Sequence, residues 1–399
     1  MEVIAESRFD SMDSPSSVGM VKTAYYTFAQ PPDELLLDSR LKIGPVTIAY
    51  ETYGCLNTGK SNAVLVFHAL SGDAHAAGFN SKRDAKPGWC DIMIGPGKPF
   101  DTSKYFVICA NIIGGCRGST GPASINPSTG KAYGLTFPEI TIRDMLKPQK
   151  ILIEHLGIKK LLCVTGGSMG AMQALQWVVS YPEMTESAII IATTPEHTAM
   201  QIAFNSIGRY AIISDPSWNN WNYYGSTQKK PDIGLAIARM IGHITYLSEE
   251  AMHKKFGRNF INGSKGGKKN KNSPDFTKEF EVESYLQYQS ESFIKRFDAN
   301  SYLYITKAID NFNIAKGFAN LAEAFKGIKA KCLLISFSSD WLYPKEQSLK
   351  MVRALKINGV ETTYINLQSE YGHDAFLIED KKLKSVLKGF LNSVLPGEG

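Results

Sequence analysis

Residues 163–175, CVTGGSMGAMQAL, bring two kinds of local structure together around one serine. The first letters favour a β-strand, and the stretch from Met169 onward favours a helix and contains no proline. Between them, Gly166, Ser168 and Gly170 form the pattern G-x-S-x-G. A strand, a tight turn and a helix around this pattern predict a nucleophile elbow that presents Ser168 at the carboxyl edge of a sheet. The alternative is a Gly/Ser turn without chemistry.

Short β-rich runs alternate with helical patterns on both sides of that serine. The runs from residue 62 onward are almost continuously apolar, as expected for strands covered on both faces. The predicted strands are 46–54, 62–70, 105–114, 160–167, 186–194, 331–339 and 360–367, and the predicted helices outside the middle of the chain are 142–156, 169–180, 345–356 and 381–395. This alternation predicts an α/β fold with a mostly parallel sheet and helices on both faces.

The middle of the chain, residues 195–325, has helical segments and no convincing strand. We interpret it as a helical lid inserted into a catalytic domain made of residues 26–194 and 326–399, with residues 1–25 as an N-terminal extension. Residues 262–275, NGSKGGKKNKNSPD, cannot form a core and are expected to be a solvated loop. Phosphate binding is the alternative for its lysines, which are Lys265, Lys268, Lys269 and Lys271.

Composition narrows the class of protein. The net charge of +6 is spread over 399 residues, so nucleic acid is not implied. No apolar run approaches the roughly 20 residues that span a bilayer, and residues 1–17 are polar and acidic, unlike a signal peptide. The six cysteines show no metal-type spacing and are interpreted as buried free thiols of a reducing compartment. We therefore expect a soluble, cytoplasmic protein.

A serine nucleophile needs a histidine base and an acid that orients it. In a fold with a nucleophile elbow the chain order must be Ser, then Asp or Glu, then His. Asp340 follows the predicted strand 331–339, and His373 follows the last predicted strand. Both would lie at the edge of the sheet where Ser168 lies. The alternatives are a loop aspartate that caps a helix and a surface histidine, but the order favours a triad.

An oxyanion hole is also required, because the tetrahedral intermediate carries a negative charge. The backbone N–H of Met169, directly after the nucleophile, is one expected donor. The second is the N–H of Leu70, in the loop after the predicted strand 62–70. His68 in the same loop is interpreted as a packed histidine and not as a second base.

Several long motifs together carry a resemblance to a known family. They are GGSMGAMQALQW, HALSGDAHAAG, NIIGGCRGSTGPASINPSTGKAYGL, GLAIARMIGHITYLS, FDANSYLYITKA, SSDWLYP and YGHDAFL. The chain resembles the homoserine O-acetyltransferases, acyltransferases of the α/β-hydrolase fold that act in methionine biosynthesis, from about Tyr26 to Leu395. Two departures are Ala171, where the family usually has glycine, and NNWNYYG at 219–225, where a glycine pair is expected before the tyrosines.

The resemblance implies a ping-pong reaction in which acetyl-CoA acetylates Ser168 and homoserine then takes the acetyl group. It implies acetyl-CoA as co-substrate, no permanently bound cofactor and no metal. Arg209 matches the family's substrate-binding arginine and would grip the carboxylate of homoserine. Asp374 directly follows His373, so it is poorly placed to orient that imidazole and is expected to receive the ammonium group. We also expect a homodimer.

Other functions remain open at this point. The same triad serves esterases and lipases, so a hydrolase is the main alternative from another reaction class. Within the family, succinyl could replace acetyl as the transferred group. A catalytically silent binding module is a third possibility, against which the intact triad argues.

Overall fold

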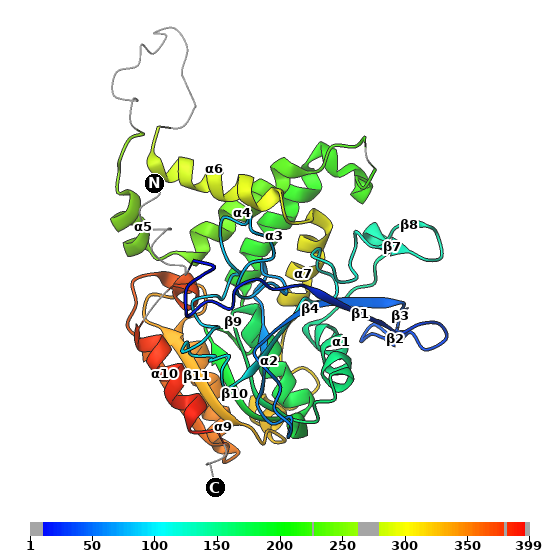
Figure 1. The fold of residues 1–399 in the computed structure, drawn as a ribbon. Helices are drawn as coiled ribbons and strands as arrows, with labels where there is room; N and C mark the ends of the chain where they lie inside the picture. The colour runs from blue at the N-terminus through cyan, green and yellow to red at the C-terminus, as the bar shows by residue number, and fades with distance from the viewer. Residues whose placement is uncertain (1–10, 226, 262–278, 379–380, 396–399) are drawn as a thin grey trace.

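An eight-stranded β-sheet organises the chain in the computed structural model, which describes residues 11–225, 227–261, 279–378 and 381–395 (Figure 1). The strand order is β1-β4-β6-β5-β9-β10-β11-β12. The strands from β6 to β12 pair in parallel, whereas β1 and β4 form an antiparallel edge. The strands are β1 Ala24–Phe28, β4 Val46–Tyr53, β5 Ala63–Phe67, β6 Phe106–Ala110, β9 Leu161–Gly167, β10 Thr185–Ile191, β11 Lys331–Phe337 and β12 Thr362–Leu367. The predicted mostly parallel sheet is confirmed.

Alternate side chains of the central strands enter two separate cores, as the two-residue period of a strand requires. Along β5, Leu65 and Phe67 belong to one core and Val64 and Val66 to the other. The first face is covered by α1 Ile142–His155, α2 Met169–Ser180 and α9 Lys345–Ile357, and the second by α10 Lys381–Asn392 and the long loop between β5 and β6. Helices therefore lie on both faces, as predicted.

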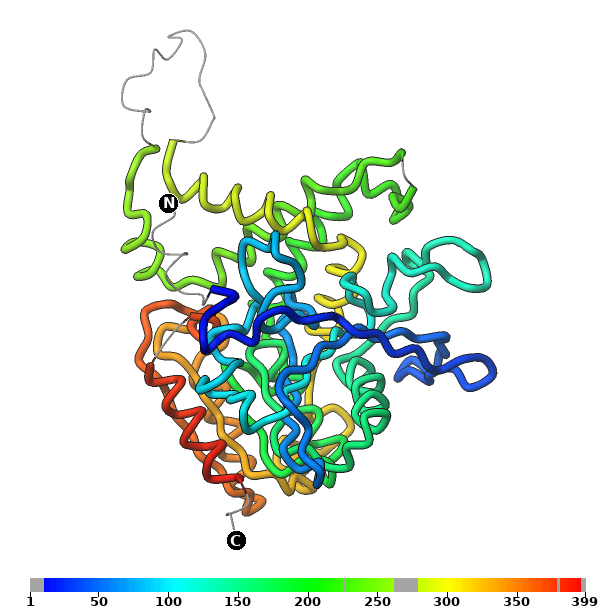
Figure 2. Tube along the Cα trace, in the orientation of Figure 1, coloured from blue at the N-terminus to red at the C-terminus, as the bar shows by residue number. Residues whose placement is uncertain are grey.

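Two small hairpins were not predicted. They are formed by β2 Leu35–Leu36 with β3 Lys42–Ile43 and by β7 Ile125–Asn126 with β8 Lys131–Ala132. Both project from the same side of the molecule (Figure 2). The edge strand β1 was also missed, because its five residues alternate between half-buried and exposed and carry no continuous apolar run.

The prediction for the cysteines is only partly right. All six are free thiols, and Cys109, Cys163 and Cys332 are buried. Cys55 is exposed, because it follows the turn at Gly54 after β4, and Cys90 and Cys116 are half-buried.

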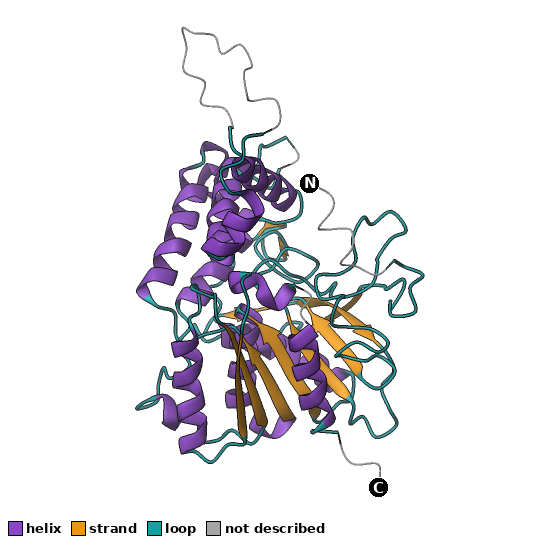
Figure 3. Cartoon of the chain, turned by 90° about the vertical axis from the view of Figure 1, so that its left-hand side faces the viewer, coloured by secondary structure: helices purple, strands orange, loops and turns teal. Residues whose placement is uncertain are grey.

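Helices of the insertion gather at one end of the sheet (Figure 3). They are α3 Ala199–Ser214, α4 Asp232–Tyr246, α5 Glu249–Phe256, α6 Glu281–Ile294 and α7 Ala299–Asp310. The short helix α8 Leu321–Phe325 instead packs against the end of α9, where Asn358 Nδ2 donates to the Ala322 carbonyl. Within the described part of residues 195–325 there is no strand longer than an isolated bridge. The loop 262–275, with its four lysines, lies entirely within residues 262–278, outside the described residues. None of the described helices has the length and apolar character needed to cross a bilayer.

The junction between α4 and α5 ties the lid to the sheet. The Trp341 indole N–H donates to the Leu247 carbonyl at 3.0 Å. The Ser248 hydroxyl donates to the carbonyl of Glu370 and also caps α5 by accepting from Ala251 N. A Cβ on Gly372 would lie 2.5 Å from Ser248 N, so only glycine fits there. The lid therefore contacts both loops that follow β11 and β12.

The departure at 219–225 has a backbone explanation. Asn219 and Asn220 have φ/ψ of 46/51 and 48/49, in the left-handed helical region. Asparagine tolerates this conformation better than most residues with a side chain. Trp221 follows with φ 71, so left-handed backbone occupies the stretch before Tyr223 and Tyr224, where the resemblance leads one to expect a glycine pair.

Candidate active site

Ser168 lies between β9 and α2, in a backbone conformation that few residues with a side chain adopt. Its φ/ψ is 59/−124, outside the regions that residues with a Cβ normally occupy. A Cβ on Gly170 would lie 2.2 Å from the Phe67 carbonyl oxygen, and one on Gly166 would lie 2.5 Å from Gly170 C. The two glycines are thus required for the turn to close. The predicted elbow geometry is confirmed.

The structure brings His373 and Asp340 together. His373 Nδ1 lies 2.8 Å from Asp340 Oδ2, with side chains 3% and 0% exposed. Asp340 Oδ1 accepts from the backbone N–H of Tyr343 at 2.9 Å, so both carboxylate oxygens are engaged. An ionised carboxylate only accepts, so His373 Nδ1 carries the proton and Nε2 is left with a lone pair. This is the arrangement that a general base requires.

The oxyanion candidates flank Ser168. Met169 is the first residue of α2, and the first N–H groups of a helix have no acceptor within the helix. Leu70 lines the same cavity as Ser168. The nearby His68 accepts from the Ile112 N–H and lies 2.8 Å from the Ala69 carbonyl oxygen, and burial lowers its pKa. The interpretation of His68 as a packed histidine therefore agrees with its surroundings.

A small cavity of about 50 Å³ adjoins Ser168 beneath the lid. A volume of this size holds a few water molecules at most. Its apolar walls come from the lid and from the loop after β11, and tyrosine hydroxyls supply much of its polarity. The lining residues used below are Ser168, Leu70, His197, Tyr246, Tyr302 and Tyr343.

The two residues predicted to hold the substrate's charges differ in their surroundings. Arg209 Nη2 lies 2.7 Å from Asp310 Oδ2, so its charge is already paired, although its Nη1 is buried without a partner. Asp374 is partly buried and has no hydrogen-bond or ion-pair partner among the described residues. Burial raises the pKa of Asp374, and the charges of His373 and Arg239 oppose that rise. Asp374 is therefore a carboxylate that needs a cation.

Arg239 in α4 was missed. Its guanidinium lies over the Phe293 ring at 4.7 Å and near the Tyr246 ring at 5.8 Å, and its buried Nε has no partner. The Tyr246 ring in turn lies 6.0 Å from the His373 ring. The signal in the sequence was an arginine inside the apolar helix GLAIARMIGHITY. Arg239 and Asp374 are thus opposite charges without a hydrogen-bond or ion-pair partner among the described residues, and the charge of Arg239 acts on Asp374.

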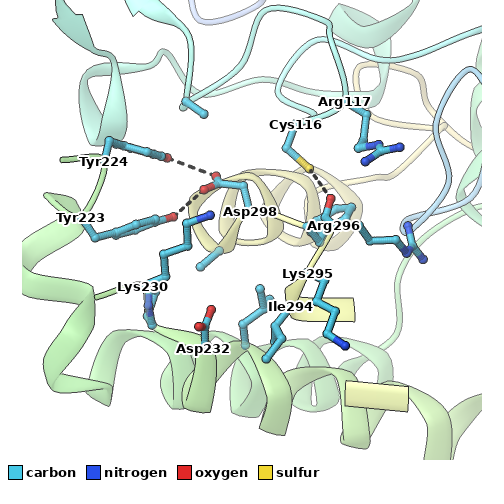
Figure 4. A pocket seen from close by; sticks show the side chains of 15 residues that line it. Cys116, Arg117, Tyr223, Tyr224, Lys230, Asp232, Ile294, Lys295, Arg296 and Asp298 are labelled. Atoms are coloured by element: carbon cyan, nitrogen blue, oxygen red, sulfur yellow. Dashed lines mark hydrogen bonds between the residues drawn. The ribbon is translucent and has the colours of Figure 1, made fainter. Parts of the chain in front are cut away.

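A larger cavity of about 260 Å³ lies between the lid and the loop after β6, and Ser168 does not line it (Figure 4). Several of its polar side chains contact one another. Tyr223 and Tyr224 donate to Asp298 at 2.8 and 3.1 Å, and Lys230 points toward the same carboxylate. Asp298 also caps α7 by accepting from Ser301 N. Asp232 also lines this cavity, and its carboxylate has no hydrogen bond or ion pair among the described residues, but no serine–histidine–aspartate set lies there. Among the described residues no three His, Cys, Asp or Glu side chains are grouped to hold a metal.

Comparisons with known proteins agree with this geometry. The family profile described as the alpha/beta hydrolase fold matches residues 62–380. The homoserine O-acetyltransferase of Methanohalobium evestigatum is 59% identical over 376 residues, which cover 94% of this chain and 74% of that protein. The protein of the same name from Solidesulfovibrio magneticus is 53% identical over 96% of this chain and 95% of its own length.

Solved structures point to two activities on one fold. The crystal structure of homoserine O-acetyltransferase from Bacillus anthracis has a TM-score of 0.85 and 32% identity, covering 94% of this chain and 98% of that one. Esterase E22 is similar at a TM-score of 0.82 and 31% identity, covering 93% and 100%. The fold alone therefore does not separate transfer from hydrolysis.

Proposed function

The chain belongs to the homoserine O-acetyltransferase family of the α/β-hydrolase fold, and from this premise we propose that it acetylates the hydroxyl of L-homoserine with acetyl-CoA through an acyl-enzyme on Ser168. One observation favours acetyl transfer over hydrolysis. Arg239 and Asp374 carry opposite charges and have no hydrogen-bond or ion-pair partner among the described residues. A zwitterionic amino acid supplies a partner for each charge. Water, the acceptor of an esterase, supplies neither.

The first half-reaction uses the elbow and the His373–Asp340 pair. Ser168 Oγ attacks the thioester carbonyl while its proton passes to His373 Nε2. The N–H groups of Met169 and Leu70 face the resulting oxyanion. The intermediate collapses as the C–S bond breaks, and the imidazolium returns the proton to the CoA sulfur. Acetyl-Ser168 and free CoA result.

The second half-reaction repeats these steps with another hydroxyl. Homoserine gives its hydroxyl proton to His373 Nε2 and attacks the ester carbonyl, and the proton then returns to Ser168 Oγ as O-acetylhomoserine leaves. We assign the ammonium to Asp374 and the carboxylate to Arg239, since both have unmet polar groups. Arg209 was predicted from the resemblance to bind the carboxylate of homoserine. We prefer Arg239 for this role because Arg209 already forms an ion pair with Asp310.

The names of the relatives favour acetyl over succinyl as the transferred group. The cavity beside Ser168 agrees with a small acyl group, since a succinyl carboxylate would need a further cation. The cytoplasmic location stays a prediction.

Acceptor dependence tests the proposed function. Intact-protein mass spectrometry after acetyl-CoA alone should show one added acetyl group, absent in Ser168→Ala. Release of CoA beyond one equivalent should then require homoserine. If acetyl-CoA were hydrolysed equally fast without homoserine, the esterase alternative would replace this proposal.

A homodimer is proposed from an exposed apolar surface on two adjacent lid helices. Contiguous exposed apolar side chains of this kind mark association surfaces more often than isolated ones do. The residues are Met200, Ile207, Tyr210 and Ile213 of α3 and Ile233, Ile237 and Ile244 of α4. Light scattering after size exclusion should give twice the chain mass for the wild type and the chain mass for Ile207→Lys/Ile237→Lys. A monomeric wild type would refute the homodimer.

A further inference from the structure

The loop after β11, which carries Asp340, is held by hydrogen bonds from the lid. Gln201 Nε2, in α3, donates to the Leu342 carbonyl at 2.6 Å, and Gln201 is buried. The next residue, Tyr343, has its hydroxyl 2.8 Å from Nε2 of His197, in the loop between β10 and α3. Tyr343 also donates its backbone N–H to Asp340 Oδ1 at 2.9 Å. Tyr343 thus contacts both the lid and the carboxylate of the triad.

His197 is itself held by a carboxylate at the end of α7. Its Nδ1 lies 3.1 Å from Asp310 Oδ1, and the two side chains are 3% and 6% exposed. Asn205 Nδ2 donates to the same oxygen at 2.7 Å, and Arg209 Nη2 lies 2.7 Å from Oδ2. Burial raises the pKa of Asp310, but these three neighbours lower it below its usual value. Asp310 is therefore ionised near neutral pH and can only accept.

These contacts form one continuous path from the lid to the triad. His197 donates from Nδ1 to Asp310, so Nε2 of the neutral ring accepts from the Tyr343 hydroxyl. The centroid of the Tyr343 ring lies 5.0 Å from that of the His373 ring. A shift of Tyr343 would therefore disturb Asp340 through the backbone N–H and His373 through the ring.

We propose that His197 and Asp310 are positioning residues of the active site. Through the Tyr343 hydroxyl they hold the Tyr343 N–H on Asp340, and Asp340 in turn orients the imidazole of His373. This role requires no contact with the reacting atoms. Because His373 serves both half-reactions, the contribution of the path is the same in each.

Tyr343→Phe keeps the ring and the backbone N–H and deletes only the link to His197. Since one neutral hydrogen bond is lost, both half-reactions should slow by the same factor, about 2- to 10-fold. His197→Ala should have a similar effect. The double variant should be no slower than the slower single variant, because the two residues act in series. A residue that contacts only one substrate would slow only one half-reaction.

Three measurements separate positioning from a loss of folding. Rapid-quench mass spectrometry gives the rate of acetylation by acetyl-CoA and the rate at which isolated acetyl-enzyme reacts with homoserine. Phenylmethylsulfonyl fluoride, which sulfonylates an activated serine with loss of hydrogen fluoride, reports on Ser168 without either substrate. The low-field proton NMR signal of His373 Nδ1–H, assigned by its loss in His373→Ala, reports on the contact with Asp340 and should shift in Tyr343→Phe.

Tyr224→Phe is the matched control. It removes a hydroxyl of the lid that donates to Asp298 at 3.1 Å. It should leave the rates of both half-reactions, the sulfonylation rate and the His373 signal unchanged.

The outcomes are distinct. Equal slowing of both half-reactions and of sulfonylation, with a shifted His373 signal, supports the positioning role. Unchanged or faster rates, a loss confined to one half-reaction, additive losses in the double variant or an unshifted signal would overturn it. If His197→Ala did not fold, Tyr343→Phe would still decide, since it removes only a hydroxyl.

The acetylation measurement rests on the proposed function. If wild-type Ser168 were sulfonylated but never acetylated, the proposed function would fail. The sulfonylation rates and the NMR signal would then still decide the role of Tyr343.

Discussion

Two histidine–aspartate pairs of similar geometry lie beside the cavity that Ser168 lines, and the second ring nitrogen of each histidine has different surroundings. In the pair at the sheet edge, Nδ1 of His373 lies 2.8 Å from Asp340, and its Nε2 has no partner among the described residues. In the pair at the junction with the lid, Nδ1 of His197 lies 3.1 Å from Asp310, and its Nε2 is occupied by Tyr343. An imidazole oriented by a carboxylate becomes a base only where its second nitrogen is left open.

The sharpest test of this contrast is to remove each imidazole in turn. His373→Ala should lower kcat/KM for acetyl transfer by about 10⁴-fold or more, because the base is lost from both half-reactions. His197→Ala should change steady-state turnover by less than about 10-fold, since only a neutral hydrogen bond is affected. Steady-state kinetics with both substrates decides. Equal losses in the two variants would mean that the pairs are not functionally different.

The arginines near the two pairs offer the next test. Arg239→Ala should lower kcat/KM for homoserine by about 30- to 1000-fold, as expected when one partner of a buried charge contact is removed. Acetylation of Ser168 should persist. Arg209→Ala should lower kcat/KM for homoserine less than Arg239→Ala does, because Arg209 already forms an ion pair with Asp310. Rapid-quench assays of each half-reaction distinguish the two residues. A larger loss in Arg209→Ala than in Arg239→Ala would mean that Arg209 binds the carboxylate of homoserine.

Asp374, next to the first pair, and Asp310, within the second, should affect stability with opposite signs. The Asp374 pKa is raised by burial, so ionised Asp374 destabilises the fold once the pH exceeds the unfolded value near 3.8. Asp374→Asn should therefore raise the free energy of unfolding at pH 7, by about 1 kcal/mol, and the gain should vanish as the pH falls below that value.

Asp310 provides the counterpart. Although burial raises its pKa, its hydrogen bonds and Arg209 lower the pKa overall, so its ionised form stabilises the fold above the unfolded value near 3.8. Asp310→Asn should lose about 1–3 kcal/mol at pH 7, and the loss should shrink as the pH falls through the folded pKa. Urea unfolding at pH 7 and at a series of pH values below 3.8 measures both variants. Stability changes of the same sign would contradict the assigned ionisation.

The smallest expected effect on stability comes from removing Asn205, one of the hydrogen-bond donors to the carboxylate of Asp310. Asn205→Ala removes the 2.7 Å hydrogen bond to Asp310, while His197 and Arg209 still hold that carboxylate. The free energy of unfolding should fall by about 1 kcal/mol, and Ser168 acetylation should change by less than about 3-fold. A loss of stability as large as that of Asp310→Asn would mean that Asp310 depends on Asn205 alone for its orientation.

Much of the first pair could be predicted and almost none of the second. Ser168, Asp340 and His373 each follow a strand that the local apolar pattern reveals, and the fold fixes their order. His197 and Asp310 are 113 positions apart, and the hydrogen bond between them depends on how a lid helix packs against the sheet. Their neighbour Tyr343 lies within the SSDWLYP motif, yet nothing in that motif shows that its hydroxyl meets His197.

The substrate-charge residues show the same limit. Arg239 was visible as a charge in an apolar helix, but only the packing of α4 against Phe293 shows that its Nε is left without a partner. Asp374 could be placed because it is adjacent to His373. Elements without a continuous apolar run were missed, and the edge strand β1 is one example.

The contacts at Leu247 and Ser248 limit how lids can be exchanged between relatives. Since this junction touches Trp341 on one active-site loop and Glu370 on the other, a lid taken from an esterase would also reset the positions of Asp340 and His373. A chimaera that keeps its own residues at 247–248, 341 and 370–372 should retain an aligned triad. One that changes only the outer helices could then report how the acceptor is chosen, separately from whether the serine reacts.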